Sequence, residues 1–211
     1  MSDGRPNIII VMADQLRADV CTREGFPLPT TPSLDRMAEQ GIWFGRAYSS
    51  APLCVPARES LLTGRYPSAH RVRENRGSDY AYYHADLIDV LKRQGYRTAM
   101  IGKNHSHLMP QKVDHWCAFS HDGGEGPGRS AQEEAFDTWL KVLNHGVSCE
   151  PTPFPVECQG PFRMVSDAQQ WIDSVRGEPF FLWLSFAEPH NPYQVPDGYE
   201  RGRIPSLLVD R

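Results

Sequence analysis

Short apolar runs alternate along this chain with amphipathic segments of helical period. Three runs are rich in β-branched or aromatic residues and predict buried strands, at 7–13, 96–101 and 180–186. Five amphipathic segments, several bounded by proline or glycine, predict helices from Pro32 to Gly41 and at 57–62, 85–94, 131–144 and 163–176. Residues 42–48 predict one more short strand. This alternation favours an α/β fold with a mostly parallel central sheet flanked by helices.

Length and composition favour a single domain over 1–211, without repeats or a linker. A net charge of −4 and the lack of a basic stripe argue against nucleic-acid binding. The chain shows no signal-peptide pattern and no apolar run long enough to span a bilayer, so we expect a cytoplasmic protein without a membrane partner. The five irregularly spaced cysteines indicate reduced thiols, although Cys149 and Cys158 could pair in an exported protein. The glycine-rich segment 119–130 predicts a surface loop or lid.

The most informative polar residues lie around Cys54. The run C-V-P-A-R at 54–58 is followed by L-L-T-G-R at 61–65. Pro56 suits the first turn of a helix, because its missing N–H costs nothing there. Cys54 would then lie just before a helix N-terminus, where backbone N–H groups favour an anion, and Arg58 would face back toward it. The alternative for Cys54 is a small structural core residue.

Each predicted strand is followed by polar residues that could bind a ligand. Asp14 and Gln15 follow the first strand, Lys103 and His105 the second, and His190 the third. In an open parallel sheet the carboxyl ends of the strands form the ligand-binding edge. Carboxylate and amide oxygens bind hard divalent cations, an ammonium suits an anionic oxygen, and an imidazole can hold a proton. The alternatives are a capping aspartate and solvated loop residues.

Taken in order, these four segments resemble the signature of type I sulfatases, the formylglycine-dependent hydrolases of the alkaline-phosphatase-like superfamily. The matching motifs are the aspartate that opens the family's metal-binding pair after the first strand, C-x-P-S/A-R with L-L-T-G-R, G-K-x-H, and P-H-x-P. The resemblance implies an alkaline-phosphatase/sulfatase-like fold and hydrolysis of sulfuric ester bonds in small-molecule or saccharide sulfate esters. It also implies a formylglycine-generating enzyme as a partner that oxidises Cys54 to formylglycine.

The resemblance also implies a metal site and a nucleophile. Asp14, Gln15 and the modified Cys54 would bind a divalent metal, with Ca²⁺ favoured and Mg²⁺ or Mn²⁺ as alternatives. The hydrated formylglycine would attack sulfur, release the alcohol and then expel sulfate. The metal would act as a Lewis acid on a sulfate oxygen.

Four further residues receive catalytic roles from the resemblance. Lys103 and Arg58 would stabilise charge near the nucleophile and the sulfuryl oxygens. His190 would lie toward the leaving oxygen as a proton donor. His105 would take the proton from the remaining hydroxyl before sulfate departs.

Two positions depart from the commoner family pattern. Gln15 stands where a second aspartate is usual, and Asn104 stands where tryptophan is common. The glutamine removes one negative charge from the metal site. Relatives with such a D-Q pair include hydrolases of phosphonate monoesters and phosphodiesters, so that activity on the same scaffold is an alternative.

The resemblance covers residues 7–199, the N-terminal portion of a sulfatase catalytic domain. The family's second metal pair and a further lysine follow the P-H-x-P loop, and this sequence contains no counterpart there. His121 and Asp122 match that pair superficially but precede the loop, so we do not assign them to the metal. His105 and His107 alone lack the ligands that zinc needs. We expect the isolated chain to be inactive without a C-terminal half or a complementary chain, or to be a silent domain that binds anions or a partner.

Overall fold

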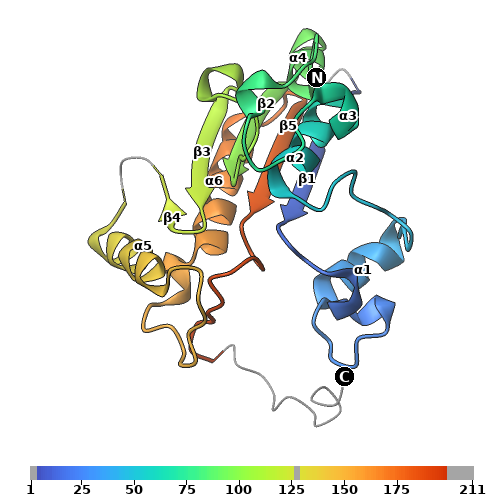
Figure 1. Ribbon diagram of the computed structural model, residues 1–211. Coiled ribbons are helices and arrows are strands. Elements are labelled where there is room, and N and C mark those ends of the chain that lie inside the picture. Colours follow the sequence, from blue (N-terminus) through green and yellow to red (C-terminus); the bar gives the residue numbers. More distant parts are fainter. Residues whose placement is uncertain (1–3, 126–128, 199–211) are drawn as a thin grey trace.

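The computed structural model describes residues 4–125 and 129–198, and a five-stranded sheet forms its centre (Figure 1). The strand order is β1-β5-β2-β3-β4. The strands are β1 (Ile8–Ala13), β2 (Arg97–Gly102), β3 (His115–Ser120), β4 (Gly123–Gly124) and β5 (Phe180–Phe186). β1, β5, β2 and β3 run parallel, and β4 pairs antiparallel with β3. The predicted α/β fold with a mostly parallel sheet is confirmed.

Helices cover both faces of this sheet (Figure 1). The α-helices are α1 (Pro32–Gln40), α2 (Cys54–Thr63), α3 (Pro67–His70), α4 (Leu87–Arg93), α5 (Ala131–Leu143) and α6 (Gly160–Ser174). Single 3₁₀ turns lie at Ala18–Val20, Thr22–Glu24, Ser78–Tyr80, Pro110–Lys112 and Val156–Cys158. Capping boxes at Asp86 and Ser130 begin α4 and α5 and satisfy backbone N–H groups that a helix leaves unpaired. Among the described helices, none is both long and apolar enough to cross a membrane.

The core lies on both sides of β5, which is buried along nearly its whole length. On one face Leu182 packs in a cluster with Trp171 of α6. On the other face Trp183 packs with Leu62 of α2 and Ile88 of α4. A strand buried on both faces needs apolar residues at successive positions, which explains the continuous apolar run that predicted it.

The prediction of a strand at 42–48 was wrong. In that segment the side chains are exposed, with Ile42 at 80% and Tyr48 at 88%. An apolar run becomes a strand only where a neighbouring strand supplies hydrogen bonds, and none of the strands described here pairs with this segment. The helix expected from residue 57 begins earlier, so that Cys54 is its first residue.

Other differences concern the middle and the end of the chain. β3 and α3 were not predicted: the apolar run of β3 is only four residues long, from Trp116 to Phe119, and α3 is a single turn. The segment 119–130 contains the end of β3 and all of β4 before it enters residues 126–128, which lie outside the described part. The polar tail from 199 onward also lies outside the described residues.

A buried cluster of charges joins α2, α4 and the loop after β2. The backbone N–H of His107 donates to Glu59 Oε1 over 2.7 Å, and its Nδ1 contacts Glu59 Oε2. The Nε2 atom of His107 lies 2.8 Å from Asp86 Oδ2, which also accepts from Lys112 Nζ over 2.6 Å. Burial acts to lower the pKa of His107, but hydrogen bonds to Asp86 and Glu59 outweigh it and raise that pKa to about 9. His107 is therefore a buried cation that fastens this loop to α2.

This cluster predicts a pH-dependent stability. An unfolded histidine has a pKa of about 6.5, so the contribution of His107 is complete below about pH 6.5 and is lost as the pH rises through about 9. The variant His107→Gln should lose about 2–3 kcal/mol of unfolding free energy at about pH 6 and much less at about pH 10. Urea unfolding at both pH values measures this, with His84→Gln on the exposed surface as control. A loss that does not change with pH would contradict the prediction.

The last residue of β2 predicts a second effect on stability. Gly102 has φ 108°, and a Cβ there would lie 2.0 Å from the carbonyl oxygen of Ser185 and 2.8 Å from Met164 Sδ. Gly102→Ala should cost about 3 kcal/mol or more, because strain adds to a clash with the backbone of β5. The matched control is Gly177→Ala, at φ 93° with no atom within 4 Å, which should cost only about 1 kcal/mol. Equal losses in thermal or urea unfolding would refute this reading.

Candidate active site

The carboxyl ends of the parallel strands bring charged and imidazole side chains to one edge of the sheet. Asp14 follows β1, Lys103 follows β2, His121 follows β3 and His190 comes soon after β5. Cys54 approaches them from the first turn of α2. Because parallel strands open at their carboxyl ends, this is the edge where such sheets bind ligands.

The floor of the site is an ion pair beside Cys54. Lys103 is fully buried, and its Nζ contacts Asp14 Oδ2. The Cys54 Sγ lies 3.7 Å from each oxygen of the Asp14 carboxylate and 3.6 Å from Lys103 Nζ. Burial acts to raise the pKa of Asp14, but the Lys103 hydrogen bond and the charges of Lys103 and Arg58 hold it below its usual value. Asp14 is therefore a carboxylate at neutral pH.

Arg58 ties the helix that carries Cys54 to the sheet. Its guanidinium is 2% exposed and donates from Nη1 to the Lys103 carbonyl oxygen over 2.8 Å and to Ser185 Oγ over 2.6 Å. Its Nη2 lies 3.8 Å from Asp14 Oδ2, and its Cζ lies 5.6 Å from the centre of the Trp183 ring. The planar guanidinium thus fixes α2 against both β2 and β5 at the level of the floor.

Four imidazoles lie above this floor. The ring of His121 stacks on His190, with centroids 3.9 Å apart, and contacts His105 and His145 edge-on at 5.9 and 5.6 Å. Its Nε2 lies 2.7 Å from Lys103 Nζ. His121 and His190 are partly buried, whereas His105 and His145 lie at the exposed rim. The site therefore has charged side chains at its floor and imidazole side chains along its wall.

The electrostatics of the floor keep two of these rings neutral. Burial, the charge of Lys103 and His190 lower the pKa of His121 to about 3. Burial of the ring's inner side and the charges of Lys103 and Arg58 lower the pKa of His105 to about 4, although the residue reaches the exposed rim. Both rings are then uncharged at neutral pH, and each offers one acceptor and one donor nitrogen.

The structure gathers most of the predicted site residues. The residues that contact the floor or its imidazole wall are Asp14, Cys54, Arg58, Lys103, His105 and His190. Gln15 differs, because it is exposed, has φ 61° and makes no hydrogen bond to any residue that the structure describes. The geometry brings these groups together, and their catalytic roles stay predictions.

His121 is a site residue that the sequence reasoning set aside. His121 precedes the P-H-x-P loop, whereas the family's second metal pair follows that loop, so the order of the motifs offered no reason to assign it to the site. Its contact with Lys103 comes instead from its place directly after β3, a strand that the pattern did not predict. Recognition of the run His115–Ser120 as a parallel strand would have drawn attention to it.

The donor atoms around Asp14 fit a hard divalent cation in part. Ligand atoms of Asp14, His121 and His190 lie within 4.8 Å of one another. The lone pair of His121 Nε2 is directed at Lys103, however, so the oxygen donor at the floor is the Asp14 carboxylate. The exposed amide of Gln15, next in the chain, has no hydrogen-bond partner among the described residues and is free to add a second oxygen. Such oxygens suit Ca²⁺ or Mg²⁺, whereas the thiol of an unmodified Cys54 is a soft ligand.

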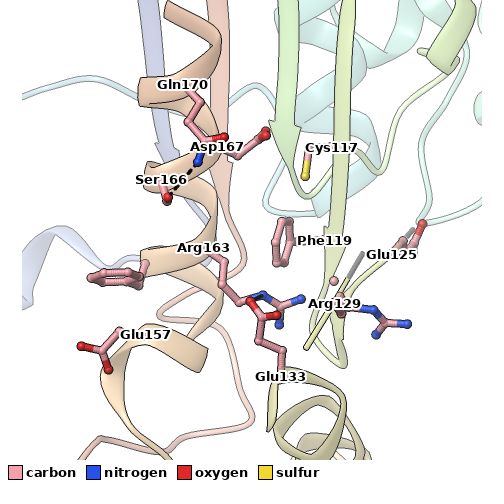
Figure 2. A pocket seen from close by; sticks show the side chains of 12 residues that line it. Cys117, Phe119, Glu125, Arg129, Glu133, Glu157, Arg163, Ser166, Asp167 and Gln170 are labelled. Carbon is pink, nitrogen blue, oxygen red and sulfur yellow. Dashed lines mark hydrogen bonds and ion pairs between the residues drawn. The ribbon is translucent and has the colours of Figure 1, made fainter. Parts of the chain in front are cut away.

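A separate cavity lies at the edge of the sheet, away from these residues (Figure 2). It has a volume of about 460 Å³ and lies between β3, α6 and the start of α5. Its two arginines are paired: Arg163 binds Glu133 over 3.3 Å and the adjacent Asp137 over 2.8 Å, and Arg129 also binds Asp137 over 2.8 Å. Figure 2 shows Arg163 reaching from α6 toward Glu133 and Phe119. Glu125 and Glu157 also line the cavity and make no ion pair with a described residue.

Comparison with known proteins agrees with this arrangement. Residues 6–204 match the family model described as Sulfatase. An arylsulfatase of Clostridium perfringens is 31% identical over 97% of this chain and 48% of its own length. An N-acetylglucosamine-6-O-sulfatase of Bacteroides thetaiotaomicron is 36% identical over 94% of this chain and 37% of its own length. The chain therefore spans about half the length of these relatives or less.

A solved structure shares the fold. The phosphonate monoester hydrolase of Agrobacterium radiobacter superposes with a TM-score of 0.71 at 23% identity, over 92% of this chain and 43% of that chain. The match of the family model to nearly the whole chain is the stronger finding. The chain belongs to the sulfatase family, which implies a divalent metal and a formylglycine.

Proposed function

We propose that this chain forms part of a sulfuric ester hydrolase in which residue 54 supplies the nucleophile. One observation carries the proposal: Cys54 Sγ lies 3.7 Å from both Asp14 oxygens and 3.6 Å from Lys103 Nζ. A nucleophile placed between a carboxylate that can bind metal and an ammonium is suited to attack on an anionic ester. A thiol has no second hydroxyl with which to expel sulfate, so formylglycine at residue 54 is part of the proposal.

The metal in this proposal is Ca²⁺, held by Asp14, Gln15 and the oxygen of the modified residue 54. A bound divalent cation withdraws electron density from a sulfate oxygen. Two described side chains cannot complete the six to eight oxygen ligands that Ca²⁺ takes, so we propose that further ligands come from outside the described residues.

Lys103 and Arg58 bind and stabilise the anionic part of the ester. Both are buried at the floor, where charge interactions are screened less than in water. Arg58 already holds the Lys103 carbonyl oxygen and Ser185, so its main effect is to fix α2 and residue 54 at the end of β2. Lys103 has no such second task, and its protons point at Asp14 and His121 beside Cys54.

The imidazoles move the protons in this proposal. His190, on the wall of the site, donates a proton to the leaving oxygen, and its Nδ1 is oriented by the carbonyl oxygen of Asn191 at 2.8 Å. His105 accepts the proton of the remaining hydroxyl at residue 54, which its neutral state at pH 7 permits.

The proposed substrate is a saccharide or small-molecule sulfate ester. The 36% identical N-acetylglucosamine-6-O-sulfatase supports the saccharide class. Gln15 supports the second candidate, a phosphonate monoester or phosphodiester hydrolase, because it removes one negative charge from the metal site. A formylglycine-generating enzyme is the proposed modifying partner, and a cytoplasmic location stays a prediction.

The test of this function combines a substrate panel with one variant. The purified full-length protein should hydrolyse an aryl or saccharide sulfate ester faster than a phosphonate monoester or a phosphodiester. Cys54→Ala should lower this rate by about 10³-fold or more, because the covalent route is lost. Mass spectrometry of the peptide that contains residue 54 should find the aldehyde in place of the thiol.

The matched control is Cys149→Ala, which removes an exposed cysteine outside the site and should leave the rate unchanged. A preference for phosphonate monoesters would favour the second candidate. Full activity of Cys54→Ala would refute residue 54 as the nucleophile.

A further inference from the structure

The contact between Lys103 and His121 determines where the imidazole carries its proton. Lys103 Nζ lies 2.7 Å from His121 Nε2, and an ammonium has donors only. The Nε2 atom must therefore accept, and the proton of the neutral ring lies on Nδ1. His121 is thus an Nδ1–H imidazole that receives one of the three protons of a fully buried lysine.

The donor side of this ring lacks a protein partner among the described residues. His121 Nδ1 is buried and makes no hydrogen bond there, and the same holds for Glu188 Oε2 and Gln194 Oε1. All three residues line one cavity of about 20 Å³. A buried donor or acceptor without a partner is costly, and a polar cavity of about 10–15 Å³ or more can hold one water.

A single water in this cavity would serve all three atoms. It would accept from His121 Nδ1–H and donate its two protons to Glu188 Oε2 and Gln194 Oε1. Three hydrogen bonds are what a buried water usually makes. The other ring nitrogen, Nε2, needs no water because it already accepts from Lys103.

We propose that His121 is a positioning residue for Lys103, held as the Nδ1–H tautomer by a single buried water shared with Glu188 and Gln194. The Lys103 ammonium has neighbours on three sides: Asp14, His121, and Cys54 Sγ at 3.6 Å. Asp14 and His121 each accept one proton of the Lys103 ammonium. The side of the ammonium that faces residue 54 is then the one left to act on the substrate. The role assigned to Lys103 rests on the proposed function, whereas the tautomer and the water rest on the geometry alone.

Packing fixes the ring in this orientation. His190 stacks on His121 at 3.9 Å with an interplanar angle of 27°. The turn that carries His121 is closed by the Asp122 backbone N–H, which donates to Ser120 Oγ over 3.2 Å. A ring held on one face and at its base cannot rotate to exchange Nε2 for Nδ1 without losing the Lys103 contact.

Two nearly isosteric variants separate this role from simple packing. The amide oxygen of His121→Gln can reach the place of Nε2, whereas the shorter amide of His121→Asn reaches only the place of Nδ1. We expect the glutamine variant to keep kcat within about threefold, because it can still accept from Lys103. The asparagine variant should lower kcat about 10- to 100-fold with a smaller change in KM, because a hydrogen bond to a charged group is lost.

The control for both variants is His84→Asn, which changes an exposed histidine elsewhere on the chain and should alter neither constant. Equal losses in the glutamine and asparagine variants would show that only the volume of His121 matters and would overturn the positioning role.

A spectroscopic measurement tests the inference without any turnover. In protein labelled with ¹⁵N-histidine, ring correlations should assign His121 to the Nδ1–H tautomer, and a high-resolution crystal structure should contain one water within hydrogen-bond distance of His121 Nδ1 and Glu188 Oε2. An Nε2–H tautomer or a dry cavity would overturn the proposal. Both readouts stand even if the protein hydrolyses no sulfate ester, so failure of the proposed function and failure of this inference are distinguishable.

Discussion

The ion pair between Lys103 and Asp14 is the interaction on which the rest of the site depends. A fully buried ammonium is stable only with a partner, and Asp14 supplies it from the end of β1, across the intervening strand β5. Breaking the pair by loss of either partner would leave an uncompensated charge under the sheet edge. The two strands that carry these residues are therefore held in register by chemistry at their ends as well as by the apolar core between them.

Helix α2 transmits this arrangement to residue 54. Two successive residues on it bind in different directions: Arg58 reaches the Lys103 carbonyl oxygen and Ser185, and Glu59 reaches His107 in the loop after β2. The loop that begins with Lys103 is thus fastened twice to the helix that begins with Cys54. In the proposed function the nucleophile and the cation that assists it must keep a fixed separation, and these two buried charge-assisted contacts would hold it.

The sequence predicts those strands and site residues whose patterns are local, and it misses those that depend on pairing between distant segments. β2 and β5 are buried on both faces, which explains their apolar runs, and the strands were predicted from those runs together with the polar residues that follow them. β1 was predicted from an equally apolar run, although it is only half covered and exposes Ile9 and Val11. The segment 42–48 is equally apolar but has no strand beside it among the described elements, and pairing is not visible in a local pattern. His121 was missed because the apolar run of β3 is short, and the segment becomes a strand by pairing with β2. A local pattern does not reveal that pairing.

The charge balance of the floor bears on which esters the proposed function allows. Lys103 and Arg58 carry two positive charges against the single carboxylate of Asp14, and the histidines with lowered pKa values add none at neutral pH. Gln15 leaves this excess in place where a second aspartate would cancel it. A sulfate ester, a phosphonate monoester and a phosphodiester each bring one negative charge, so net charge at the floor does not by itself separate the two candidate functions. Discrimination between them must then come from the groups around the leaving oxygen, where His190 and the imidazole stacked on it form the wall of the site.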